Sequence, residues 1–245
     1  MNGTEEFALD TATPVWKGAP ATRPLTGLTV LMVEDSRYAS EAVRLLCLRS
    51  GARIRRADSL RTAARHLQTY RPAVMIVDMG LPDGDGAELI RQVAQAAPRV
   101  PVILGISGDP MREDEAIAAG ADGFLTKPLE SLAAFQQAIL AALPEQARQL
   151  GLRALPDDLI APDTTALRDD LTHVAQVLDA MEDTSAVDYI ARFLAGVARS
   201  SHDHGLADAA ETLARDHAEG RALAADLARI SGLVQDRLMA AGGSA

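Results

Sequence analysis

The stretch Ala73–Gly86 (AVMIVDMGLPDGDG) decides the fold of this chain. It opens with the apolar run Ala73–Val77, which is short and lies between helical patterns, as buried parallel strands do. The acid Asp78 follows the run at once, and the glycine- and proline-rich segment 79–86 is typical of a loop. We therefore predict a buried strand that delivers the Asp78 carboxylate to one edge of a sheet.

Similar apolar runs occur on both sides of this stretch, and each is followed by a polar side chain. The runs are Leu28–Val33, Val102–Ile106 and Gly123–Leu125, and the side chains that follow them are those of Glu34, Asp35, Ser107 and Lys127. A weaker strand is predicted over 52–56, and helices are predicted over 36–50, 59–70, 87–96, 110–120 and 129–143. Strict alternation of strand and helix indicates a parallel three-layer α/β domain. Because chemistry collects at the carboxyl ends of such strands, we expect the polar side chains to share one crevice.

Composition and charge limit the remaining possibilities. The chain of 245 residues suits one or two domains, and its 48% hydrophobic and 24% charged residues are ordinary for a globular protein. Its single cysteine, Cys47, lies in an apolar helical pattern and is expected to be a buried thiol without a disulfide. No apolar run reaches membrane-spanning length, and residues 1–20 do not resemble a signal peptide, so we expect a cytoplasmic protein.

We predict four segments along the chain. Residues 1–26, with the lone Trp16, form a mostly disordered extension, 27–145 the α/β domain, 146–163 a proline-containing linker, and 164–241 a bundle of four amphipathic helices. Residues 146–245 contain 9 basic and 16 acidic side chains, a net charge of −7. A DNA-binding output needs a basic face, so this charge disfavours DNA as the partner of the bundle.

The polar crevice has the parts of a phosphoryl-accepting site. Three converging carboxylates (Glu34, Asp35 and Asp78) repel one another unless a cation neutralises them, and oxygen ligands without His or Cys suit Mg²⁺. A carboxylate can then act as a nucleophile toward phosphorus, while the Lys127 ammonium and the Ser107 hydroxyl stabilise the developing charge. No glycine-rich loop for a nucleotide is present. We therefore predict an aspartate that becomes phosphorylated without an ATP site.

Residues 27–145 resemble the receiver domain of bacterial two-component response regulators. The matching segments are Val30–Ser36, Met75–Gly86 and Gly120–Pro128, in the order and strand context of that family. The resemblance implies a (βα)₅ doubly wound parallel sheet of flavodoxin-like type, phosphorylated on Asp78 by a phosphohistidine. It also implies Mg²⁺ held by Asp35, Asp78 and the Gly80 backbone carbonyl, with Glu34 helping through water. Ser107 and Phe124 match the family's switch hydroxyl and switch aromatic, and the bond before Pro128 is expected to be cis.

Simpler structural interpretations exist for single residues. Asp35 or Ser36 is able to cap a helix, and Asp109 is able either to cap the next helix or to touch the phosphoryl pocket. Phe124 is equally compatible with plain core packing. The joint occurrence of these residues at strand ends favours the functional interpretation.

The C-terminal helices permit several interpretations. An acidic bundle without aromatic or basic patches fits an interaction or dimerisation module, or one that only stabilises the receiver. It also faintly resembles a degenerate histidine phosphotransfer domain, in which Arg192 takes the histidine position and Ala195 the lysine position. Arginine cannot carry a phosphoryl group as that histidine does, and His202 and His204 lie in the wrong local pattern.

We therefore expect a phosphoprotein of a two-component or phosphorelay system, not a separate enzyme, with slow self-dephosphorylation and a non-DNA-binding helical output. Its expected partners are a histidine kinase or phosphotransfer protein, and a protein or a second copy on the helices. The alternatives are a phosphorelay protein with a phosphotransfer-like bundle and a transcriptional regulator.

Overall fold

The structure of the protein is a computed structural model that describes residues 23–144, 164–181, 184 and 186–242. Most of the predicted extension with Trp16, and the predicted linker 146–163, lie outside the described residues. At the start of the described chain, Leu25 is fully buried in the core and its backbone N–H donates to the carbonyl of Ser50 at 2.9 Å. The packed domain therefore begins before Gly27, the boundary that we predicted.

The amino-terminal domain contains a parallel sheet of five strands in the order β2-β1-β3-β6-β7. The strands are β1 (Thr29–Val33), β2 (Arg53–Ala57), β3 (Val74–Asp78), β6 (Val102–Ser107) and β7 (Gly123–Thr126). All four pairings between them are parallel. The central strands β3 and β6 are buried along their whole length, which explains their unbroken apolar runs. The predicted five-stranded doubly wound sheet is confirmed.

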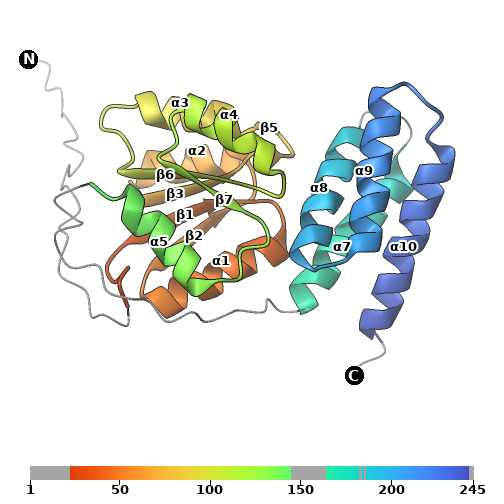
Figure 1. Ribbon diagram of the computed structural model, residues 1–245, viewed down its shortest axis with the longest axis horizontal. Helices are drawn as coiled ribbons and strands as arrows, with labels where there is room; N and C mark the ends of the chain where they lie inside the picture. Colours follow the sequence, from red (N-terminus) through yellow and green to blue (C-terminus); the bar gives the residue numbers. More distant parts are fainter. Residues whose placement is uncertain (1–22, 145–163, 182–183, 185, 243–245) are drawn as a thin grey trace, which may run out of the picture.

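Five helices cover the two faces of this sheet (Figure 1). One face carries α1 (Arg37–Ser50) and α5 (Leu132–Ala142), and the other carries α2 (Leu60–Thr69), α3 (Gly86–Gln95) and α4 (Glu113–Ala119). Side chains of Ser36, Ser59, Asp85 and Ser131 each accept a backbone N–H in the first turn of the helix that they precede. These caps satisfy amides that have no partner inside the helix.

The segment between β3 and α3 is more ordered than the loop that we predicted. It forms a two-residue antiparallel ladder between β4 (Gly80–Leu81) and β5 (Gly84–Asp85). The Asp109 side chain caps a 3₁₀ turn, η1 (Pro110–Arg112), and α4 starts only after it. The bond before Pro128 is cis, as expected, and the bond before Pro98 is a second cis bond that the sequence did not indicate.

Four further helices form the predicted C-terminal domain, which lies at one end of the sheet (Figure 1). They are α7 (Thr164–Ala180), α8 (Val187–Ser200), α9 (His204–Ala218) and α10 (Ala224–Gly242). Their apolar faces pack into a hydrophobic cluster that contains no residue of the sheet domain. Among the helices described, none is both long and apolar enough to cross a membrane.

Gly86 shows how closely the chain packs behind the strand that ends at Asp78. A Cβ at Gly86 would lie 2.0 Å from the backbone oxygen of Asp78 and 2.9 Å from Met79 Cα. Both neighbours are backbone atoms, so relief requires a shift of the chain that carries Asp78. The glycine therefore allows α3 to start directly against the end of β3.

We predict opposite effects for two Gly→Ala substitutions. Gly86→Ala should lower the free energy of unfolding by about 1–3 kcal/mol, because it overpacks the start of α3. Gly232→Ala, the matched control in α10, has no heavy atom within 4 Å of the added Cβ and should raise it by about 0.5–1 kcal/mol. Urea unfolding followed by circular dichroism measures both, and equal effects of the two substitutions would contradict this account.

Candidate functional site

Three carboxylates meet at the carboxyl ends of β1 and β3. Glu34 and Asp35 follow β1 directly, and Asp78 is the last residue of β3. The two strands are neighbours with Val33 opposite Val77, so the acids beyond them converge. One oxygen from each of the three acids lies within 4.8 Å of the other two, and Glu34 and Asp78 are buried. The structure thus brings together the acids that the sequence singled out.

Lys127 places its ammonium group between two of these acids. Its Nζ lies 2.6 Å from Glu34 Oε2 and 3.3 Å from Asp78 Oδ1, and only 6% of its side chain is exposed. Its backbone N–H donates to the carbonyl of Ser107 at 2.8 Å, which ties the end of β7 to the end of β6. The long lysine stem therefore reaches into the site from a backbone that is held in register.

The surroundings of Glu34 and Asp35 disfavour the charged forms of these carboxylates. Burial, and then the charge of Asp78, raise the pKa of Glu34 well above its ordinary value, despite the opposing effect of Lys127. The same two causes raise the pKa of Asp35 to about 6. Burial disfavours the charge of Lys127, but Asp78 and Glu34 together outweigh it and raise its pKa. One ammonium does not balance three carboxylates, so the cluster fits a divalent cation, and its all-oxygen donors are those that Mg²⁺ prefers.

A cavity of about 260 Å³ lies in front of Asp78. Its lining includes Gly80, Ser107 and Gly108 from the ends of the strands. Ser107 is buried, and its Oγ accepts a hydrogen bond from the backbone N–H of Asp109 at 3.1 Å. The predicted hydroxyl of Ser107 and the predicted backbone carbonyl position at Gly80 therefore border the same space as Asp78.

Phe124 lies on β7 outside this cavity. Its ring packs on the apolar cluster beneath α3 and α4, where its Cδ2 would be 3.1 Å from a Cβ at Gly105. Gly105 thus makes room for the ring within β6. This position is compatible with core packing, and the switch role of Phe124 stays a prediction.

The C-terminal bundle forms the opposite wall of the cavity. Residues of α8 and α9 line it, among them Arg192 and Arg199. Arg199 Nη1 would be 2.9 Å from a Cβ at Gly108, and Arg199 Nη2 is paired with Glu211 at 2.6 Å. Arg192, which takes the histidine position in the degenerate phosphotransfer pattern, therefore borders the cavity in front of Asp78.

Tyr189 of α8 contacts the acid cluster directly. Its hydroxyl donates a hydrogen bond to Asp35 Oδ2 at 3.1 Å. Burial and the Asp35 charge raise the pKa of Tyr189, so that it remains a donor. The ring of Phe193, one turn further along the helix, packs against the Tyr189 ring with centroids 5.7 Å apart. No spacing pattern in the sequence links Tyr189 to an acid 154 positions earlier, so Tyr189 was not among the predicted site residues.

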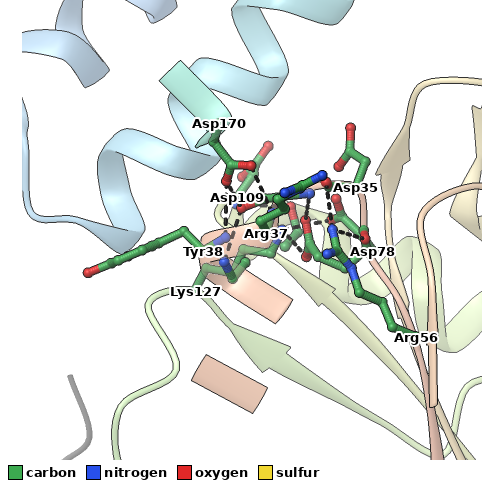
Figure 2. A network of polar contacts seen from close by, with 12 residues as sticks. Asp35, Arg37, Tyr38, Arg56, Asp78, Asp109, Lys127 and Asp170 are labelled. Carbon is green, nitrogen blue, oxygen red and sulfur yellow. Dashed lines mark hydrogen bonds and ion pairs between the residues drawn. The ribbon is translucent and has the colours of Figure 1, made fainter. Parts of the chain in front are cut away.

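Asp170 of α7 caps a helix of the other domain. Its carboxylate accepts hydrogen bonds from Ser36 Oγ at 2.7 Å and from the backbone N–H groups of Arg37 at 2.9 Å and Tyr38 at 3.1 Å (Figure 2). Only 3% of Asp170 is exposed. The N-terminus of α1 carries partial positive charge, which an acid stabilises. Ser36 caps α1, as the sequence suggested, and Asp170 of the distant helix α7 provides a second cap.

The segment between α8 and α9 also makes a contact between the domains. His202 lies between α8 and α9, and its Nε2 is 2.9 Å from Glu130 Oε1, just beyond the cis bond to Pro128. The His202 side chain is 57% exposed, so this is a rim contact. Such exposed contacts contribute little to stability.

The family model described as the response regulator receiver domain matches residues 30–139. Residues 30–139 are a two-component response regulator receiver domain. This receiver ends before the first residue of α7, so the family match does not extend to the bundle. The Glu34, Asp35, Asp78 and Lys127 cluster therefore lies within the matched segment and Tyr189 outside it.

Curated relatives of the receiver are transcriptional regulators. The KDP operon transcriptional regulatory protein KdpE of Escherichia coli K12 is 34% identical over 99 residues, 40% of this chain and 44% of that protein. The virulence transcriptional regulatory protein PhoP of Salmonella typhimurium 14028s is 32% identical over 116 residues, 46% of this chain and 52% of that protein. The chain therefore spans about half the length of the curated relatives that it matches.

A solved structure with a similar receiver is that of a putative response regulator from Chloroflexus aurantiacus J-10-fl. It is 31% identical, covers 46% of this chain and 98% of its own, and has a TM-score of 0.43.

The raised pKa of Asp35 predicts a pH dependence of stability in metal-free protein. With a folded-state pKa of about 6 against an ordinary value of 3.8, the folded state binds more protons than the unfolded state between these values. The free energy of unfolding should therefore fall as pH rises through this window, by about 1–3 kcal/mol from this group.

Asp35→Asn isolates that contribution. In EDTA, the variant should gain stability relative to wild type as pH rises from 4 to 7, whereas Asp114→Asn, an exposed control on α4, should keep a constant difference. Urea unfolding at a series of pH values measures both. If the difference in the free energy of unfolding between Asp35→Asn and wild type did not change with pH, the pKa of Asp35 would not be raised in the folded state.

Proposed function

We propose that the chain is a response regulator that accepts a phosphoryl group on Asp78 and signals through its helical bundle without binding DNA. The observation that carries this proposal is the buried Lys127 ammonium, ion-paired to Asp78 beside two further carboxylates. Such an arrangement positions a nucleophile and a donor for phosphoryl oxygens in one place. The donor would be the phosphohistidine of a histidine kinase or phosphotransfer protein.

Asp78 would attack the phosphorus of the phosphohistidine. The O–P bond forms at the Asp78 carboxylate as the N–P bond breaks, and the imidazole nitrogen leaves with the bonding electron pair. The Lys127 ammonium and the Ser107 hydroxyl then hydrogen-bond the new phosphoryl oxygens, and Gly108 leaves them space. Attack of water on the acyl phosphate accounts for slow self-dephosphorylation, so no separate enzyme activity is proposed.

Mg²⁺ suits the oxygen donors of this site. Asp35, Asp78 and the Gly80 backbone carbonyl would hold it, with Glu34 acting through water, and Asp35, Asp78 and Gly80 all border the cavity. When bound, the ion neutralises charge on the carboxylates and on the transferring phosphoryl group. The raised pKa values of Glu34 and Asp35 support a need for this added positive charge.

Asp78→Asn should abolish labelling of the full chain by phosphoramidate in the presence of Mg²⁺. The amide oxygen is a poor nucleophile, whereas Asp114→Asn removes an exposed acid of α4 and should label like wild type. Intact-protein mass spectrometry detects the added phosphoryl group. Persistent labelling of Asp78→Asn would show that another residue is the acceptor.

The proposal that the bundle signals without binding DNA rests on its charge and on the packing of its helices. Residues 146–245 carry −7 of the net charge of −10, and the apolar faces of the helices pack against one another in a single hydrophobic cluster. Phosphorylation would reposition Ser107 and Phe124, alter the face of α4, β7 and α5, and change the contacts of the bundle with the receiver or with a protein partner. A transcriptional regulator, as KdpE and PhoP are described, remains the second candidate.

Retention on heparin or duplex DNA separates these outputs. We expect the full chain to pass through either column without binding at low salt, with and without phosphoramidate and Mg²⁺. Its net negative charge repels the anionic matrix more strongly than its scattered arginines attract it. Salt-dependent retention after phosphorylation would favour the transcriptional regulator. A phosphorelay bundle would instead show an acid-labile phosphoryl group on a C-terminal proteolytic fragment, for which Arg192 offers no acceptor.

A further inference from the structure

The phosphoacceptor cavity is enclosed by both domains. Asp78 and Ser107 lie on the receiver side, and α8 and α9 lie on the other, with Arg199 over Gly108. Only 10% of the Asp78 side chain is exposed. A phosphoryl donor must bring its phosphorus to within a few ångströms of the attacking oxygen. A donor carried on another protein would therefore meet α8 before it reached Asp78.

Two polar contacts, one buried and one partly buried, hold the bundle in this position. Asp170 accepts three hydrogen bonds at the start of α1, and Tyr189 donates one to Asp35. The two residues come from different helices, α7 and α8. Asp170 contacts the first turn of α1, and Tyr189 contacts Asp35, which lies between β1 and α1. Hydrogen bonds to charged groups are stronger than neutral ones, so these contacts favour one defined closed arrangement.

Elsewhere the boundary between the domains is incompletely packed. A second cavity of about 840 Å³ lies between α7 and the receiver, bordered by charged side chains such as Arg56 and Asp169. The two domains have separate hydrophobic clusters, so moving them apart opens neither core. Interfaces of this kind within a chain permit relative motion of the domains. The bundle is therefore able to leave the site without unfolding.

We propose that the α7–α10 bundle is a lid on the phosphoacceptor site, latched by Asp170 and Tyr189, which a phosphodonor protein must displace to reach Asp78. The identity of the displacing partner rests on the proposed function, but the opening of the lid does not. The surface that the lid covers is the receiver face around Gly80, Ser107 and Lys127. The receiver thus has an internal binding partner that competes for the same face as the external donor.

A cysteine inside the cavity would report the opening of this lid. Ser107→Cys places a thiol on the covered face with little change in size, in the full chain. The native Cys47 is fully buried, and burial raises the pKa of its thiol to about 12, so it should remain unreactive. The probe is a maleimide that bears a protein-sized polymer, compared with N-ethylmaleimide, which is small enough for the cavity.

In this background, Tyr189→Phe should speed the reaction with the polymer maleimide about tenfold, the factor expected for one charged hydrogen bond, and Asp170→Asn, which removes the charge that accepts three, should speed it at least as much. N-ethylmaleimide should respond much less, because the small reagent does not need the lid displaced. Two controls should leave both rates unchanged: Tyr70→Phe, whose hydroxyl has no hydrogen-bond partner among the described residues, and Asp208→Ala, an exposed acid of α9. Unchanged polymer rates in both latch variants would overturn the lid.

Hydrogen exchange provides a second measurement, which distinguishes movement of the whole bundle from a disturbance confined to the site of the substitution. If the bundle moves as one unit, Tyr189→Phe on α8 should also speed exchange of the Arg37 and Tyr38 amides, which Asp170 on α7 holds, by about tenfold. Unaltered exchange there would show that the two latches open independently and would contradict the proposal. Neither readout needs phosphorylation, so a failure of Asp78 to label would count against the proposed function alone.

Discussion

A buried ammonium shared between carboxylates is the interaction on which the rest of this structure depends. Lys127 contacts both Glu34 and Asp78, each of which belongs to a different strand end. A buried acid without a partner is costly, and so is a buried amine. The three strands that carry these groups must therefore end at one level of the sheet. The parallel registers of β1, β3, β6 and β7 meet that requirement.

The charge imbalance among the carboxylates at the strand ends also makes them a contact point for the second domain. Asp35 has no contact with Lys127 within ion-pair distance among the described residues, and the Tyr189 hydroxyl from α8 partly compensates it. Next to it, the N-terminal amides of α1 attract the carboxylate of Asp170. The groups contacted are the Asp35 carboxylate and the first amides of α1, which have no partner within their own helix. The bundle therefore lies where the charged groups of the receiver have the fewest partners within their own domain.

Sequence reasoning succeeded where a local pattern reflects burial on both sides of a strand. The apolar runs before Asp78 and Ser107 are fully buried strands, and Ser36 and Asp109 do cap the turns that follow them. It was less accurate where a few backbone hydrogen bonds override composition, as in the β4–β5 ladder. It also misjudged Leu25, because one apolar residue in a polar tail carries no periodic signal. Its packing depends on α1 and on Ser50, which lie far along the chain.

The sequence by itself determined the receiver fold and the set of polar residues at its strand ends, because parallel strands buried on both faces require continuous apolar runs and end where polar residues begin. Only the tertiary structure decided that the acidic bundle faces Asp78 rather than solvent. That choice depends on single contacts between helices more than a hundred residues away, such as Asp170 with α1 and Tyr189 with Asp35. Contacts of this kind follow from the position of one domain on another, and no local periodicity encodes it.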